Sequence, residues 1–151
     1  MRTQKLNHSV YQHQYHIVWG TKYRRKYLKE YVETEFRKLL FNLVKKYPTL
    51  YIHAMKTDHD HVHLQIEVSP DISVAKAIQR IKSYTSLRLK KKFPFIRKIY
   101  LDSGIWSVGY FSSTVGLNEE QVKKYISYQG RKDFPKQTKL KFSWDVGNPG
   151  S

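Results

Sequence analysis

The stretch "TDHDHVHLQIEVS", Thr57 to Ser69, carries the clearest structural pattern in the chain. From His61 to Val68 polar and apolar residues alternate, which is the period of a β-strand with one buried face. The buried face is predicted to hold Val62, Leu64, Ile66 and Val68, and the other face His61, His63, Gln65 and Glu67. The stretch therefore predicts a strand that contributes apolar side chains to a core and presents two histidines on its opposite side.

Other segments predict further strands of a sheet. "LYIHAMKT", Leu50 to Thr57, precedes the histidine strand across a short polar turn, which favours a hairpin. Farther upstream, Val10 to Gly20 alternates in part and is rich in Tyr, Ile, Val and Trp, so it also reads as a strand. Two later segments, Phe95 to Leu101 and Gly104 to Ser113, are joined by a short turn and are expected to pair as another hairpin.

Three segments show the apolar spacing of helices. The first, Val32 to Tyr47, ends before the proline of "YPTL", because proline disfavours helix at the residue before it. The second follows Ser73, a suitable N-cap. The third begins at Asn118, with Gln121 at the capping-box position, and is expected to end at Gly130, a natural C′ residue.

The order of these elements predicts an α+β fold. It consists of a single antiparallel sheet with helices on one face, in the split βαβ arrangement of ferredoxin-like and RRM-like domains. With 151 residues, the chain is long enough for one domain and short for two. We therefore expect one domain over residues 1–151, with a flexible tail after about residue 143.

The charge balance indicates a polyanionic partner. The chain has 28 Lys and Arg against 12 Asp and Glu, a formal net charge of +16, and nucleic acid is the partner that such an excess favours. A solvated lysine-rich surface is the alternative, and membrane binding is a weaker one because no amphipathic terminal helix accompanies the charge. Candidates for phosphate contacts are Lys22, Arg24, Arg25, Lys90, Lys91, Arg131 and Lys132, and candidates for base stacking are Tyr23 and Tyr27.

The composition also bears on the cellular compartment. The chain has no cysteine, which excludes disulfides and thiolate metal sites. No apolar run approaches the roughly 18 residues of a membrane span, and the polar start lacks the apolar middle of a signal peptide. A cytoplasmic protein without membrane contact is expected.

Two pairs of residues suggest a site. His61 and His63 are two residues apart on a strand, so their imidazoles can bind one ion, although two solvated histidines on an open sheet face would show the same spacing. Tyr125 and Gln129 are four residues apart and share a helix face. A tyrosine hydroxyl can attack a phosphodiester that a metal polarises, and an amide oxygen can complete the metal site. Tyr125 could equally be a core residue at the edge of an apolar stripe.

Together these motifs resemble a known family. "DHVHLQIEV", Asp60 to Val68, followed some sixty residues later by "YISYQ", Tyr125 to Gln129, in a short basic chain, resembles the single-tyrosine transposases of the HUH nuclease superfamily. The resemblance extends over nearly all of the chain. It implies a divalent ion, Mg²⁺ or Mn²⁺, bound by His61, His63 and a third polar residue on the tyrosine helix, here Gln129.

The resemblance also implies an activity and partners. Its members cleave single-stranded DNA to a 5′-phosphotyrosine and a free 3′-OH, and they recognise hairpins at the ends of the smallest insertion sequences. They act in prokaryotes as homodimers in which the tyrosine helix can dock against the partner's histidines. The segment 111–118, with small residues and a glycine, could serve as the hinge for such docking.

Two alternatives remain at the level of sequence. One keeps the chemistry in a replication-type or domesticated HUH nuclease, although no helicase or P-loop pattern follows in this chain. The other is a non-catalytic module that binds RNA or single-stranded DNA on a similar sheet. An RNA-recognition domain would carry aromatic residues where His61 and His63 stand, so the histidines disfavour it.

Overall fold

One antiparallel sheet organises the computed structural model, which describes residues 13–114 and 118–133. The strands are β1 (His13–Gly20), β2 (Leu50–Asp58), β3 (His61–Val68) and β4 (Phe111–Ser113). Their order in the sheet is β2-β3-β1-β4, and every neighbouring pair is antiparallel. The strand that carries the two histidines thus lies inside the sheet, and the predicted hairpin of β2 and β3 is confirmed.

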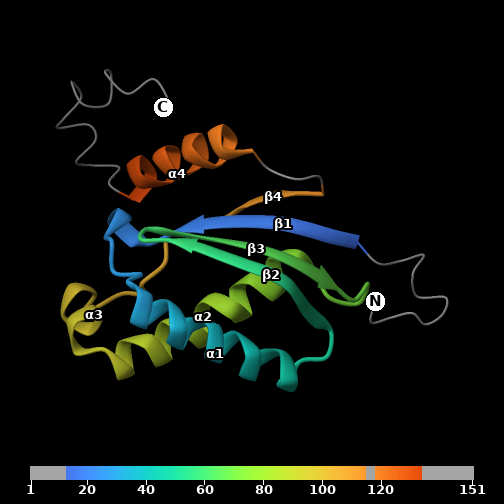
Figure 1. Ribbon diagram of the computed structural model, residues 1–151, viewed down its shortest axis with the longest axis horizontal. Helices are drawn as coiled ribbons and strands as arrows, with labels where there is room; N and C mark the ends of the chain where they lie inside the picture. The colour runs from blue at the N-terminus through green and yellow to red at the C-terminus, as the bar shows by residue number, and fades with distance from the viewer. Residues whose placement is uncertain (1–12, 115–117, 134–151) are drawn as a thin grey trace.

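Helices cover both faces of this sheet (Figure 1). The helices are α1 (Glu30–Lys46), α2 (Val74–Lys92), the short α3 (Pro94–Ile99) and α4 (Glu119–Asp133), and a 3-10 turn, η2 (Lys22–Arg24), follows β1. α1 and α2 pack on one face, whereas α4 lies across the opposite face beside β1 and β4. The α+β fold with a single antiparallel sheet is confirmed, and the placement of α4 differs from the expectation of helices on one face.

The core forms where the alternation of β3 predicted it. Val62, Leu64 and Ile66 have no exposed surface and belong to one cluster with side chains of α1 and α2. Burying one such side chain contributes about 1.5–3 kcal/mol. Because these residues occupy one face, His61 and His63 are directed to the other, which is the face that α4 covers only in part.

The predicted hairpin of Phe95 to Leu101 with Gly104 to Ser113 is wrong. The first segment forms α3, with Pro94 in its first turn. Ile96 and Tyr100 are both buried, and their spacing of four residues is the helical period, which outweighs the local strand propensity. Of the second segment, only β4 is a strand, and it pairs with β1.

The caps of the later helices are mostly as predicted. Ser73 Oγ accepts a hydrogen bond from Lys76 N at 3.0 Å, and the reciprocal hydrogen bonds between Asn118 and Gln121 form the expected capping box. Gly130 does not end α4, which continues to Asp133. A Cβ at Gly130 would lie 2.8 Å from Arg24 Cγ, so this glycine permits close packing instead of a C-cap.

Some expectations fall outside the described residues. They concern the first residues of the Val10 to Gly20 strand, part of the 111–118 hinge and the tail after about residue 143. Within residues 13–114 and 118–133, no helix has both the length and the apolar character that a membrane span requires.

Candidate active site on the open face of the sheet

His61 and His63 stand side by side on the α4 side of β3, and both are half-buried. The ring of His63 lies 5.9 Å from that of His16 on β1, in an edge-on contact. Burial lowers the pKa of His63, and the neighbouring His16, Lys56 and His61 lower it further. A neutral imidazole has a free lone pair, which is the form that binds a metal ion.

Asp60 orients the first histidine. Its Oδ1 lies 2.9 Å from His61 Nδ1, and its other oxygen pairs with the guanidinium of Arg24. Burial opposes ionisation of Asp60, but the hydrogen bond with His61 and the charge of Arg24 outweigh it and lower the pKa of the carboxyl to about 2. A carboxylate on Nδ1 fixes the tautomer and leaves the lone pair of Nε2 available to a metal ion, the usual arrangement behind a histidine ligand.

Gln129 connects the tyrosine helix to the sheet. Its side chain is fully buried, and its Oε1 accepts a hydrogen bond from Gly20 N at 2.6 Å. Its Nε2 donates to the hydroxyl of Tyr125 at 2.7 Å and to the carbonyls of Val108 and Gly109 at 3.0 and 3.2 Å. The structure thus brings the predicted pair Tyr125 and Gln129 together, while the amide oxygen is held by the backbone of β1.

Tyr125 is half-buried over the β4 side of the sheet, with its ring 5.6 Å from that of Phe111. Phe111 pairs with Val18, and Val18 pairs with His63. Phe111, whose ring the Tyr125 ring contacts, therefore lies in the same row of the sheet as His63, with Val18 between them. Burial raises the pKa of Tyr125, partly offset by the hydrogen bond from Gln129, so the phenol is protonated at neutral pH.

Several contacts hold α4 on the sheet of its own chain. Arg24 Nη1 donates to Ile126 O at 2.5 Å, and Asp133 Oδ2 accepts hydrogen bonds from Tyr23 N at 2.8 Å and from Ser107 Oγ at 2.6 Å. Arg24 therefore contacts both the helix and Asp60, which precedes the histidine strand.

A cleft of about 480 Å³ opens between α4 and His61. Its lining comprises Tyr23, Arg24, Asp58, Asp60, His61, Lys123, Ile126, Ser127 and Gly130. Lys123 and Ser127 precede and follow Tyr125 by two residues, which places both of them on nearly the opposite side of the helix from it. The cleft and the tyrosine hydroxyl therefore lie on different flanks of α4.

The histidines fit part of a metal site. In the part of the chain that the structure describes, no cluster of three or more His, Cys, Asp or Glu side chains could hold an ion. His61 and His63 offer two nitrogen ligands on one face, and Asp60 orients the first. Because Mg²⁺ and Mn²⁺ prefer oxygen, the remaining ligands must come from an amide such as that of Gln129, from a phosphate or from water.

The DNA-binding candidates divide into three groups. Tyr27 is 1% exposed and its hydroxyl donates to Ile105 O at 2.8 Å, so the prediction that it stacks on a base is wrong. Arg24, Lys90 and Arg131 make contacts within the protein: Lys90 Nζ donates to Ser103 O at 2.8 Å, and Arg131 is buried. Lys22, Tyr23, Arg25 and Lys91 keep exposed surface, and the side chain of Lys132 lies outside the described residues.

Sequence reasoning missed two residues of the site. Asp60 directly precedes the histidine pair, and its position was the only available signal. His16 belongs to β1, where it pairs with Gln65 of β3, so its ring reaches His63 only through the pairing of these two strands. No local pattern around His16 predicted this contact.

Comparison with known proteins identifies a family. The family model of IS200-like transposases matches residues 9–129. The transposase for insertion sequence element IS200 of Salmonella typhimurium is 29% identical over 131 residues, which cover 85% of this chain and 84% of that protein. The ISDra2 transposase TnpA of Deinococcus radiodurans is 27% identical over 125 residues, which cover 82% of this chain and 89% of that protein.

Two solved structures share the fold. A Deinococcus radiodurans R1 protein assigned as a transposase superimposes with a TM-score of 0.71 at 24% identity, covering 84% of this chain and 98% of that one. A REP-associated tyrosine transposase bound to a REP hairpin superimposes with a TM-score of 0.50 at 14% identity, covering 77% of this chain and 63% of that one. Since the family model spans well over half of its residues, the chain belongs to the family of IS200-like transposases.

Proposed function

We propose that the protein cuts and rejoins single-stranded DNA by transesterification through Tyr125, at the hairpin ends of an insertion sequence. The observation that carries the proposal is the pair His61 and His63, the first oriented by Asp60, on the sheet face over which α4 holds Tyr125. The hairpin substrate is proposed from family membership and from the hairpin bound by the REP-associated relative.

His61, His63 and Gln129 are proposed to hold the divalent ion, Mg²⁺ or Mn²⁺. When bound, such an ion polarises the scissile phosphate and offsets charge on the leaving oxygen. Gln129 Oε1 accepts a hydrogen bond from Gly20 N and keeps a second lone pair, which is the one that could bind the ion. The ligand role of Gln129 therefore requires the ion to lie close to Gly20, the residue that pairs with His61 on β3.

Tyr125 is the proposed nucleophile. Its hydroxyl oxygen forms a bond to phosphorus, the bond from phosphorus to the 3′-oxygen breaks, and that oxygen leaves as a 3′-OH after taking up a proton. The phenol releases its own proton in this step, because its raised pKa keeps it protonated beforehand. The 5′-phosphotyrosine conserves the phosphodiester energy, so another 3′-OH can reverse the reaction and join new strands.

The proposed assembly is a homodimer that acts in the cytoplasm. The structure of the single chain has α4 on its own sheet through Gln129, Arg24 and Asp133. Exchange of α4 between two subunits would preserve these contacts, with the sheet supplied by the partner. Such an exchange is the proposed route to active sites shared between subunits.

The test is formation of a covalent adduct. Incubation with single-stranded DNA from the regions that flank the gene, in the presence of Mn²⁺, is expected to give a protein–DNA species that survives a denaturing gel. Tyr125→Phe should abolish this adduct while DNA binding persists, and Tyr128→Phe, which alters an exposed tyrosine of the same helix, should retain it. An adduct formed by Tyr125→Phe would refute the assignment, and metal-independent binding without cleavage would favour the non-catalytic binding module.

A further inference from the structure

Three aromatic side chains form a cluster on the helical side of the molecule. The ring of Tyr31, at the start of α1, lies 5.6 Å from that of Phe93 and 6.2 Å from that of Phe95, and the two phenylalanine rings are 6.2 Å apart. Tyr31 is 55% exposed, and both phenylalanines keep some surface. Phe93 and Phe95 flank Pro94, the first residue of α3, so the start of α1 contacts the start of α3 here. We call these three residues the aromatic platform.

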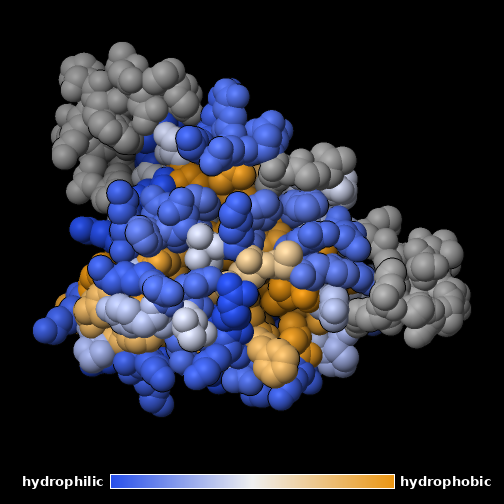
Figure 2. Space-filling model, viewed as in Figure 1, coloured by the Kyte–Doolittle hydropathy of each residue, from blue (hydrophilic) through white to orange (hydrophobic). Residues whose placement is uncertain are grey.

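Positive charge surrounds the aromatic platform. Exposed cationic residues lie before α1, at the end of α2 and on α3: Lys26, Lys29, Lys91, Lys92, Arg97 and Lys98. Three acidic residues of α1 lie in the same region, Glu30, Glu33 and Glu35, of which Glu33 pairs with Arg37 at 2.7 Å and Glu35 with Lys92 at 3.4 Å. Figure 2 shows apolar surface over α3 and the start of α1 enclosed by hydrophilic surface. An aromatic surface within a cationic rim suits a ligand that is both flat and anionic.

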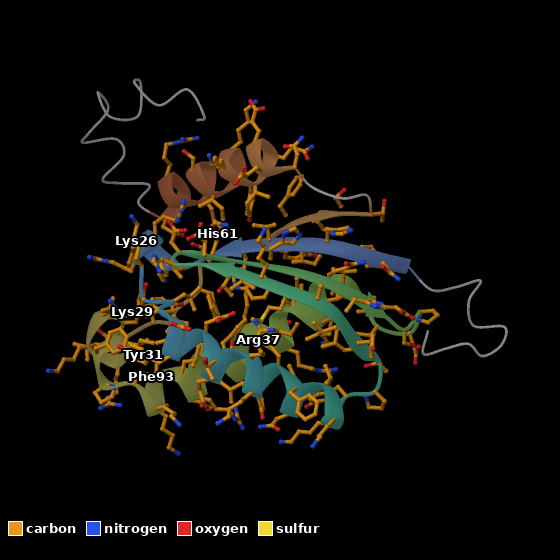
Figure 3. All side chains as sticks on the ribbon, in the orientation of Figure 1. Lys26, Lys29, Tyr31, Arg37, His61 and Phe93 are labelled. Atoms are coloured by element: carbon orange, nitrogen blue, oxygen red, sulfur yellow. The ribbon has the colours of Figure 1, made fainter. Side chains whose placement is uncertain are left out.

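The segment between η2 and α1 connects the platform to the turn before His61. Leu28 N donates to His59 O at 3.1 Å, and Arg24 pairs with Asp60, so the chain between η2 and α1 runs along the turn that leads into the histidine strand. Figure 3 shows Lys26, Lys29, Tyr31 and Phe93 one after another down the same side of the molecule, with His61 at the level of Lys26. A nucleic-acid strand that leaves His61 can pass along these four side chains.

We propose that an unpaired base of the single-stranded DNA that enters at His61 stacks on the aromatic platform. Lys26 and Lys29 neutralise the phosphates between His61 and the platform. The inference rests on the proposed function in taking single-stranded DNA as the ligand. Stacking requires an exposed ring face, and Tyr31 supplies it while Phe93 and Phe95 fix its position. Every base has a π-face, so this contact holds DNA of any sequence.

The experiment measures binding without metal and without cleavage. In a Tyr125→Phe background, fluorescence anisotropy gives the affinity for (dT)20 and for an abasic strand with the same number of phosphates. Tyr31→Ala is expected to weaken binding of (dT)20 roughly tenfold and to leave binding of the abasic strand unchanged. Tyr31→Phe, which keeps the ring, should bind (dT)20 within roughly twofold of the parent.

The matched control is Phe41→Ala. Phe41 is 62% exposed on the same helix and has Lys45 Nζ 4.7 Å from its ring, but it lies near the other end of α1. Its removal should leave binding of both strands unchanged. Equal losses of affinity for (dT)20 in Tyr31→Ala and Phe41→Ala would overturn the proposal that the platform stacks a base. An equal loss of affinity of Tyr31→Ala for the abasic strand would overturn it as well. Weaker binding to phosphatidylglycerol vesicles with unchanged (dT)20 binding would instead assign the patch to membranes and overturn it too.

A second variant keeps the proposal testable if Tyr31→Ala fails to fold. Replacing Lys26 and Lys29 together by glutamine should reduce the salt dependence of (dT)20 binding by about 0.7 in log–log slope for each lost contact. An unchanged slope would contradict the path along these lysines. Failure of the adduct test with Mn²⁺ leaves these measurements unaffected, so the two proposals fail separately.

Discussion

At the scale of single residues, the site depends on what stands behind each functional side chain. His61 can present Nε2 to a metal because Asp60 occupies Nδ1, and Asp60 is held by Arg24. This arrangement gives Arg24, which the sequence suggested as a phosphate contact, a positioning role inside the protein. A lysine there could not form the same two contacts with Asp60 and the carbonyl of Ile126, because it lacks the planar fork of donors.

Asp60→Asn is expected to weaken Mn²⁺ binding by roughly 10–100-fold, because loss of an orienting carboxylate has this effect on histidine sites. Isothermal titration with Mn²⁺ measures the change. Asp58→Asn is the control, since Asp58 ends β2 directly before the same turn and its carboxylate accepts only from His59 N at 2.8 Å among its described hydrogen bonds. A similar loss for both variants, or no loss for Asp60→Asn, would show that Asp60 does not orient His61.

At the scale of elements, the position of α4 decides whether the phenol can reach the histidines. The side chain of Gln129 holds this helix by hydrogen bonds to three backbone groups, on Gly20, Val108 and Gly109. The hydrogen bond from Gly20 N, at 2.6 Å, is the shortest of the three. A Cβ at Gly20 would lie 2.8 Å from Gln129 Oε1 and 3.5 Å from Ile126 Cδ1. The absence of a side chain at this position is therefore a condition for the observed docking of α4.

Gly20→Ala should displace the amide of Gln129 and loosen α4 while the rest of the sheet persists. Faster amide hydrogen exchange in α4 is the expected result, with a loss of about 1–3 kcal/mol in the free energy of unfolding, the usual range for overpacking. Gly104→Ala is the control, because a Cβ there meets only Ser86 Oγ at 3.4 Å. Unchanged exchange in α4 of Gly20→Ala would show that Gln129 does not hold the helix.

The same elements show which features of the fold could be predicted from the sequence. β3 was predictable because its alternation is set by one buried face, and the caps at Ser73 and Asn118 are local hydrogen bonds that sequence encodes directly. The extension of α4 past Gly130 was not, because the contacts that its last residue, Asp133, makes are with Tyr23 and Ser107, which are distant in the sequence. That His61 and His63 share one face of β3 was predictable from their spacing. Where Tyr125 lies over the sheet was not, because its ring packs against Phe111 of another strand.

At the scale of the whole molecule, one lysine links the layers on the two sides of the sheet. Lys82 of α2 donates from Nζ to Ser107 O at 2.8 Å and to Gly109 O at 2.5 Å. The carbonyl of Gly109 also accepts from Gln129 on α4. The segment 107–109 thus connects the helical layer of the core with the helix that carries Tyr125.

Burial lowers the pKa of Lys82 to about 8, although Asp133 nearby acts in the opposite direction. In the unfolded chain a lysine titrates near 10.4. Between these values the unfolded chain keeps a proton that the folded chain has released, so the contribution of Lys82 to stability rises with pH through this window. From pH 7 to pH 10 the rise is about 2–3 kcal/mol at most, since the fully shifted pKa sets the upper limit.

Urea unfolding of the wild type and of Lys82→Gln at pH 7 and pH 9.5 isolates this contribution. Glutamine retains a donor for the carbonyls of Ser107 and Gly109 but does not titrate, so the stability of the wild type relative to the variant should increase with pH. Tyr27 and Tyr100, whose pKa values burial raises, are present in both proteins and cancel in the comparison. A difference that stays constant or falls with pH would mean that Lys82 is solvated in the folded protein. Lys82 would then not connect α2 to segment 107–109.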